Sequence, residues 1–102
     1  METRAHRIKL KSGSLERVRE WAAEITTHRE EAIATLRDET VALECFFLEQ
    51  TADGDYLICI MTAESFEQSK AAVEKSLYRI DAYHQQFKRD TWESGHRLEH
   101  LP

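Results

Sequence analysis

The sequence contains no asparagine, and only three glycines and two cysteines stand among its 102 residues. With so few glycines there is no glycine-rich loop of the kind whose backbone cradles nucleotide phosphates. A GxSxG segment is also absent, and neither Cys45 nor Cys59 has a histidine close by in the sequence. We therefore expect neither a phosphate-loop protein nor an enzyme with a serine or cysteine nucleophile.

Positive charge and long apolar runs are scarce as well. Lysine and arginine total 14 against 19 aspartates and glutamates, and the resulting net charge of −5 leaves no broad basic surface for nucleic acid. No segment approaches the roughly 18 apolar residues of a membrane helix. The opening METRAHRIKLKSG also lacks the apolar part of a signal peptide. We expect a cytoplasmic protein that binds neither nucleic acid nor membrane.

What is present is typical of a small globular protein. Hydrophobic residues make up 41% of the chain and charged residues 32%, a composition found in folded, soluble proteins. A chain of this length has room for one hydrophobic core, so we expect a single domain over residues 1–102.

The hydrophobic pattern predicts strands and helices in a definite order. Residues 6–10 alternate in polarity, as in a half-buried strand. Ser14 can cap a helix, and the segments THRE (27–30) and SFEQ (65–68) are capping boxes. The predicted elements are a strand at 6–10, a helix from 14 that restarts at 27 and ends at 36, strands at 40–50 and 55–62, a second long helix from 65 through 87, and a weak strand within 94–102.

This order is that of the ferredoxin-like βαββαβ plait, an α+β fold. In such a plait a four-stranded antiparallel sheet carries both helices on one face. The other face must meet water or a partner.

The two central strands should form a hairpin that keeps the cysteines apart. If Asp53 and Gly54 form a two-residue turn, Cys45 lies opposite Thr62 and Cys59 lies opposite Leu48. The two sulfurs then point to opposite faces of the sheet. Two reduced thiols are expected instead of a disulfide.

The hairpin is apolar on both of its faces. One face carries Val41, Leu43, Cys45, Phe47, Tyr56, Ile58 and Ile60, and the other carries Ala42, Glu44, Phe46, Leu48, Leu57, Cys59 and Met61. Leaving either face in water would lose several kcal/mol at roughly 25 cal/mol per Å², so we expect a homodimer with two sheets packed face to face. We assign Ile58 and Ile60 to the face under the helices. The face with Phe46, Leu48 and Met61 is assigned to the dimer, although one β-bulge would reverse the two.

The layout, together with the run YLICIMTAESFEQSKAAVEKSLYRIDAYHQQF, resembles the dimeric α+β barrel superfamily of ferredoxin-like proteins. The segment IDAYH is similar to a small uncharacterised family of bacterial and archaeal proteins within it. The resemblance implies a barrel formed by two sheets at a dimer interface, and a small-molecule site between sheet and helices.

The superfamily includes quinone-forming monooxygenases, haem-degrading enzymes, isomerases, sugar mutarotases and regulatory domains, so the resemblance implies architecture more than chemistry. The oxygenases use an asparagine, tryptophan and histidine set, and this chain has no asparagine. A mutarotase-like proton shuttle fits the available residue types better, with His28 or His84, Tyr56 and Glu44. We expect no cofactor.

His84 is the first candidate site residue, because it falls within the apolar stripe of the second long helix. Asp81, three residues earlier, could hydrogen-bond one ring nitrogen and raise the imidazole pKa, which would suit a general base. The alternative is a core histidine with a local partner, and Asp81 in water or paired with a basic neighbour.

Glu44 is a carboxylate in the middle of an apolar strand face. It must reach water, a cation such as Arg7 or Lys9, or a cavity in which its pKa would be elevated. Tyr56 could donate a hydrogen bond to a ligand, or pack with its hydroxyl in water. Catalytic candidates are therefore His84, Asp81, Glu44 and Tyr56.

Trp21 and His28 would share one line of an unbroken helix and could bind a ligand through an aromatic wall and an ionisable edge. A core tryptophan and an exposed histidine are the alternative. His96 and His100 have no partners at a spacing typical of a metal site, so no metal is expected. RNA recognition is not expected either, because the strand DYLICIMTA lacks stacking aromatics. Whether the protein is an enzyme or a non-catalytic dimeric module stays open.

Overall fold

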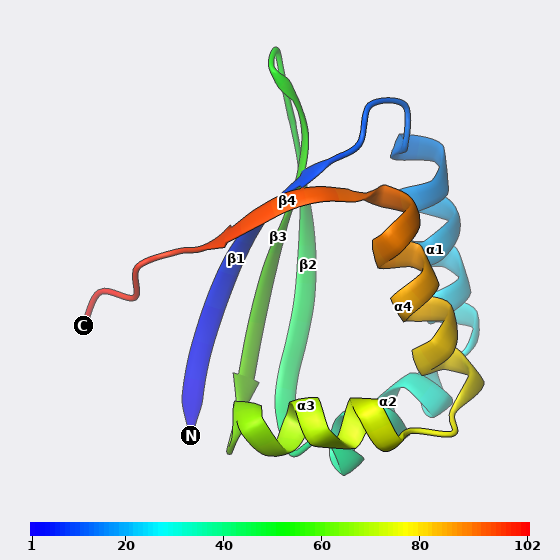
Figure 1. Cartoon of the computed structure of the whole chain (residues 1–102), viewed down its shortest axis with the longest axis vertical. Coiled ribbons are helices and arrows are strands. Elements are labelled where there is room, and N and C mark those ends of the chain that lie inside the picture. The colour runs from blue at the N-terminus through cyan, green and yellow to red at the C-terminus, as the bar shows by residue number, and fades with distance from the viewer.

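The computed structural model describes residues 1–102 and places four strands and four helices along the chain (Figure 1). The elements are β1 (Glu2–Leu10), α1 (Leu15–Thr27), α2 (Arg29–Asp38), β2 (Val41–Thr51), β3 (Gly54–Ala63), α3 (Phe66–Lys75), α4 (Arg79–Thr91) and β4 (Trp92–Arg97). None of the four helices combines the length and the apolar character that a membrane span requires.

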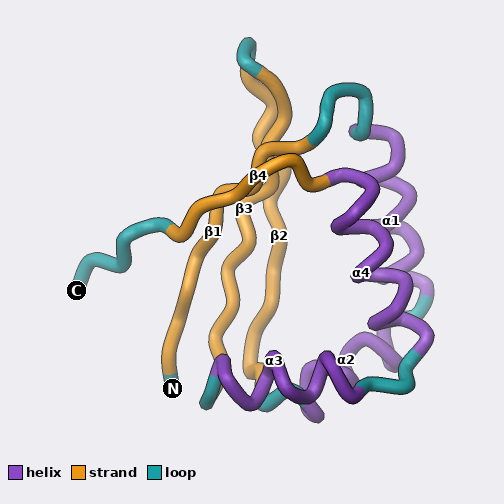
Figure 2. The backbone as a smooth tube through the Cα atoms, viewed as in Figure 1, coloured by secondary structure: helices purple, strands orange, loops and turns teal.

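The strands form one antiparallel sheet in the order β2-β3-β1-β4. Helices α1 and α4 stand side by side across from the sheet, and α2 and α3 lie at one end of the space between them (Figure 2). The α+β class and the four-stranded antiparallel sheet are confirmed, and the order of elements is consistent with a βαββαβ plait. The last strand begins at Trp92, two residues before the predicted segment.

The core lies between the sheet and helices α1 and α4. Ile8 and Leu10 of β1 point toward the helices, as the alternation within 6–10 predicts. They meet Val18 and Trp21 of α1 and Phe87 of α4, which is fully buried. One face of β1 and β3 and one stripe of α1 and α4 are thereby removed from water.

The hairpin turn lies one residue earlier than predicted. Thr51 pairs with Gly54, so Ala52 and Asp53 form the turn, and Thr51 stabilises it by accepting from the backbone N–H of Asp53 through Oγ1 (3.1 Å). The pairing therefore shifts by two residues. Because a shift of two preserves the alternation of faces, the cysteines still lie on opposite faces, Cys45 opposite Ile60 and Cys59 opposite Phe46.

The assignment of the two hairpin faces was wrong. Phe46 and Leu48 pack against the core beneath the helices, whereas Leu43 and Phe47 are exposed on the open face. Met61 lines the space on the helix side too. The set assigned to a dimer is therefore the inner face, and the set with Ile58 and Ile60 is the outer one.

Pairing with β1 is the physical reason for this arrangement. Ile8 lies opposite Leu57 in the β1–β3 ladder, and residues opposite each other share a face. Since Ile8 must face the core, Leu57 and its alternate neighbour Cys59 face it as well, and both are buried. A bulge between Val41 and Leu43 shifts the β2–β3 register at the start of β2. Val41 lies opposite the buried Ala63 and is itself buried, whereas Leu43 lies opposite Thr62 and is exposed.

The predicted break near residue 27 is confirmed, with His28 standing between α1 and α2. The predicted cap is not. Thr27 donates its hydroxyl to the carbonyl of Ala23 within α1, and no side chain caps α2. At the second capping box, Ser65 accepts from the backbone N–H of Gln68 at 3.1 Å and does cap α3.

The second long helix is in fact two helices. Between α3 and α4 the chain is extended at Ser76, and Leu77, predicted in the apolar stripe, is fully exposed. The Ser76 hydroxyl accepts from the N–H of Tyr78 and donates to the carboxylate of Asp81. A serine side chain that bonds nearby groups in this way competes with the helical backbone pattern and separates α3 from α4.

Candidate functional site

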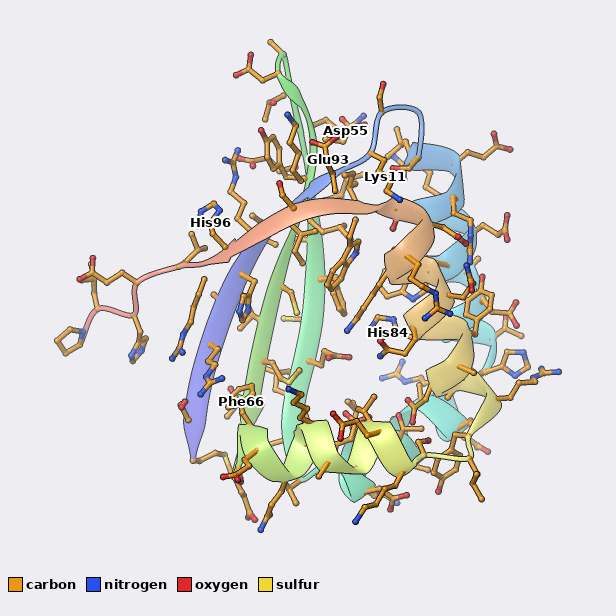
Figure 3. All side chains as sticks on the ribbon, viewed as in Figure 1. Lys11, Asp55, Phe66, His84, Glu93 and His96 are labelled. Atoms are coloured by element: carbon orange, nitrogen blue, oxygen red, sulfur yellow. The ribbon has the colours of Figure 1, made fainter.

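A cavity of about 570 Å³ lies between the sheet and the helices. Its walls come from β1, β2 and β3 on one side and from all four helices on the other, with α3 across one end (Figure 3). The polar side chains that line it include Glu39, Glu44, Ser69, Asp81, His84, Gln85 and Lys88. A cavity of this size suits a small organic molecule.

Two aromatic rings, supported by a third, form the inner wall of the cavity. The indole of Trp21 stacks on Phe87 with ring centres 4.3 Å apart and meets the edge of Phe46 at 5.0 Å. Trp21 and Phe46 line the cavity directly, and Phe87 supports Trp21 from behind. A wall fixed by such contacts is rigid and favours flat or apolar groups.

His84 extends from α4 toward the sheet (Figure 3). Its Nδ1 accepts a hydrogen bond from Nε1 of Trp21 at 3.1 Å. Because an indole N–H only donates, Nδ1 must be unprotonated, and the neutral imidazole carries its proton on Nε2. Burial, reinforced by the charge of Lys88, lowers the pKa of His84 to about 3.

Of the two alternatives for His84, the contact with Asp81 is not formed, and His84 is a buried histidine with a partner in the protein. Trp21, and not Asp81, hydrogen-bonds the ring nitrogen Nδ1 of His84. The pKa of His84 is lowered, whereas a contact with Asp81 would have raised it. Asp81 accepts a hydrogen bond from Ser76 instead. It still lines the cavity, one helical turn from His84.

Glu44 lines the cavity from β2 and makes no ion pair with either predicted cation. Arg7 pairs with Glu49 at 2.9 Å, and Lys9 lies 3.7 Å from Glu93. Burial raises the pKa of Glu44, Lys88 opposes that rise, and Asp81 adds to it. Of the alternatives drawn from the sequence, the structure places Glu44 in a cavity.

Glu39 is a cavity residue that the sequence did not reveal. It follows α2 directly, and only 7% of its surface is exposed. Burial raises its pKa to about 7, with further repulsion from Asp81 and Glu44. In the sequence it stands among exposed acidic residues at a helix end, and nothing there distinguishes it from a solvated glutamate.

Thr40 fixes the backbone immediately after Glu39. Its φ of 60° lies in the left-handed region, which is unfavourable for a β-branched residue, and its buried hydroxyl has no partner. The Thr40 N–H donates to Arg37, and its carbonyl accepts from Glu64. The connection from α2 to β2 is thus pinned from both sides, and Glu39 is held toward the cavity.

Two predicted site residues lie elsewhere. Tyr56 is on the open face of the sheet, where the Arg7 guanidinium lies 3.7 Å from its ring centre. His28 contacts Glu24 at 2.9 Å beside the break between α1 and α2. The cavity therefore brings together His84, Asp81, Glu44 and Trp21 but neither Tyr56 nor His28.

No group of three or more histidine, cysteine, aspartate or glutamate side chains is arranged to hold a metal ion.

Comparison with known protein families shows the family to which this chain belongs. The model of a family of unknown function, DUF6176, matches residues 1–101. The chain belongs to DUF6176. A search of curated proteins finds no match to this DUF6176 chain.

A solved structure resembles the DUF6176 chain in fold. It is the crystal structure of protein Atu4242 from Agrobacterium tumefaciens, a structural genomics target, with a TM-score of 0.56 and 13% sequence identity. The similarity covers 96% of this chain and 89% of that one. At this level of identity the likeness concerns the fold alone.

Proposed function

We propose that this protein binds a small organic molecule in the cavity between sheet and helices. The observation that carries the proposal is the hydrogen bond from Trp21 to His84, which holds a neutral imidazole with its Nε2–H available to the cavity. An N–H donor fixed beside an aromatic wall recognises a carbonyl or hydroxyl oxygen on a flat or apolar ligand.

The experiment is a ligand screen read by NMR at the two tryptophan side chains. Trp21 lines the cavity and Trp92 does not, so the chain contains its own control. A compound bound in the cavity should shift the indole N–H signal of Trp21 and leave that of Trp92 in place. If a broad screen of carbonyl and hydroxyl compounds never moves Trp21 selectively, the proposal fails.

A second candidate is proton transfer on such a ligand, as in an isomerase or mutarotase. Glu44 is an unpaired carboxylate with a raised pKa, and Phe46, two residues further along the same strand face, has its ring 6.0 Å from that of His84. Glu44 would remove a proton from a carbon or hydroxyl of the ligand. The Nε2–H of His84 would stabilise the negative charge that develops on the adjacent oxygen.

This second candidate has its own test. With carbonyl ligands found in the screen, the wild type should exchange a carbon-bound proton next to the carbonyl for deuterium in heavy water, a position where exchange without a catalyst is slow. Glu44→Gln should abolish this exchange while the Trp21 shift on binding persists. Exchange that is equally fast in Glu44→Gln would rule Glu44 out as the base.

We further propose that the protein is a homodimer through the open face of the sheet. Leu43 and Phe47 are 49% and 57% exposed there, and Cys45, Ile58 and Ile60 share that face. A contiguous apolar sheet face of this kind is typical of an interface. The dimeric α+β barrel superfamily, which the sequence resembles, joins two sheets through the face opposite the helices.

A further inference from the structure

The cavity holds carboxylates that form no hydrogen bond or ion pair with any group of the protein. Glu44 lines it from β2, Asp81 from α4, and Glu39 from the connection between α2 and β2. Asp81 accepts a hydrogen bond from Ser76, but no hydrogen bond or ion pair reaches the carboxylates of Glu39 and Glu44. Two acceptors thus face the cavity without a donor.

Glu39 carries the strongest implication, because its side chain is more than nine-tenths buried. Its carboxylate oxygens are not enclosed by protein, since Thr40 Oγ1 and Trp92 Nε1 are the enclosed side-chain polar atoms without a partner, so they open onto the cavity and lack a donor there. The strained, pinned backbone at Thr40 keeps Glu39 in this position. The missing partner is therefore expected to belong to a ligand.

The cavity's own cations do not supply that partner. Arg4 pairs with Glu2 at 3.0 Å, and its guanidinium lies 4.2 Å from the centre of the Phe66 ring. The ammonium of Lys88 lies 4.9 Å from the centre of the Trp92 ring and forms no ion pair, although its charge lowers the pKa of both Glu39 and Glu44. Lys70, the third cation in the lining, forms no ion pair either.

We infer that the ligand carries an ammonium group that binds between Glu39 and Glu44, with its apolar body against Trp21 and Phe46. This inference rests on the proposed function, since it concerns the same cavity. An ammonium supplies three N–H donors and a positive charge, which matches two unpaired carboxylates. An oxygen elsewhere on the ligand would accept from Nε2 of His84.

The test compares three probes of one shape: benzylamine, benzyl alcohol and benzoate. Each is titrated into the protein at pH 7.5 while the indole N–H signals of Trp21 and Trp92 are followed. Benzylamine should bind at least about tenfold more tightly than benzyl alcohol, because charge-assisted hydrogen bonds to a buried carboxylate outweigh neutral ones. Benzoate should bind most weakly.

Variants then assign the ammonium position. Glu39→Gln and Glu44→Gln keep the side-chain shape and remove the charge, and each should weaken benzylamine binding about tenfold or more while leaving benzyl alcohol binding within about twofold. Glu30→Gln, at an exposed position of α2, is the matched control and should change neither. Unchanged Trp92 signals would verify that each variant is folded.

The possible failures are distinguishable. If benzyl alcohol or benzoate moves Trp21 at concentrations equal to or below those of benzylamine, the cavity binds small molecules but the ammonium assignment is wrong. The assignment is equally overturned if both glutamine variants bind benzylamine like the wild type. If none of the probes moves Trp21, the ammonium assignment falls, and the broader ligand screen decides the proposed function.

Discussion

Phe46 and Phe47 are consecutive residues of β2 whose rings lie on opposite sides of the sheet. The ring of Phe46 meets Trp21 at 5.0 Å beneath α1, whereas Phe47 is 57% exposed on the open face. One side of the sheet thus closes the chain's own core and cavity, and the other presents an apolar surface.

Substituting each phenylalanine by aspartate separates these two roles. Phe46→Asp should destabilise the fold by at least about 3 kcal/mol, because it replaces a packed ring with a carboxylate inside the core. Phe47→Asp changes an exposed side chain, so it should leave the chain folded and yield a monomer. Light scattering after size-exclusion chromatography measures the mass, and an unchanged dimer for Phe47→Asp would contradict the proposed interface.

Removing the charge of Glu39 should stabilise the protein in a pH-dependent way. Its pKa is raised from 4.5 to about 7, so the folded state holds a proton that the unfolded state releases. The stability linked to this proton is fully present below pH 4.5, declines as the pH rises from 4.5 to 7, and is lost above 7.

Glu39→Gln should therefore be more stable than the wild type by up to about 3 kcal/mol at pH 8, and equally stable at pH 4. Urea unfolding at the two pH values measures the difference, and Glu30→Gln serves as the exposed control on the same helix. A gain that is the same at both pH values would show that the charge of Glu39 is not its cause.

Thr40→Gly should stabilise the protein by about 1 kcal/mol. Glycine adopts a positive φ without strain, and the change also removes a buried hydroxyl that has no partner. Thr51→Gly, in a strand where the hydroxyl caps the hairpin turn, should destabilise instead. Thermal unfolding of both variants checks the contrast, and a loss of stability in Thr40→Gly would mean that the positive φ is not a source of strain.

Local signals in the sequence predicted much of the fold. The alternation of residues 6–10, the cap at Ser65 and the interruption near Thr27 are each determined by neighbouring residues. The separation of Cys45 from Cys59 was also predictable, since only the alternation of faces matters and a register error of two residues leaves it unchanged.

Features that depend on distant contacts were not predictable in the same way. The inner face of the hairpin is decided by the pairing of Ile8 with Leu57, which joins residues far apart in the chain. Glu39 is buried because the pinned connection at Thr40 turns it toward α4. Nothing in the sequence distinguishes Ser76 from a serine inside a helix. Its hydrogen bonds to Tyr78 and Asp81, which separate α3 from α4, are seen only in the structure.

The candidate site shows the same division. His84, Glu44 and Trp21 were found because a polar or aromatic side chain within an apolar pattern is visible in the sequence. The partner of His84 was not, because Trp21 approaches it from another helix. That partner reverses the chemistry, from a base with a raised pKa to a neutral donor.

The protonation state of His84 tests the account most directly. A ¹⁵N NMR titration of the histidine side chains should find His84 neutral, with its proton on Nε2, from pH 7 down to pH 5, because its pKa is lowered to about 3. A His84 that gains charge between pH 7 and pH 5, or that carries its neutral-state proton on Nδ1, would contradict the hydrogen bond from Trp21 and the site built upon it.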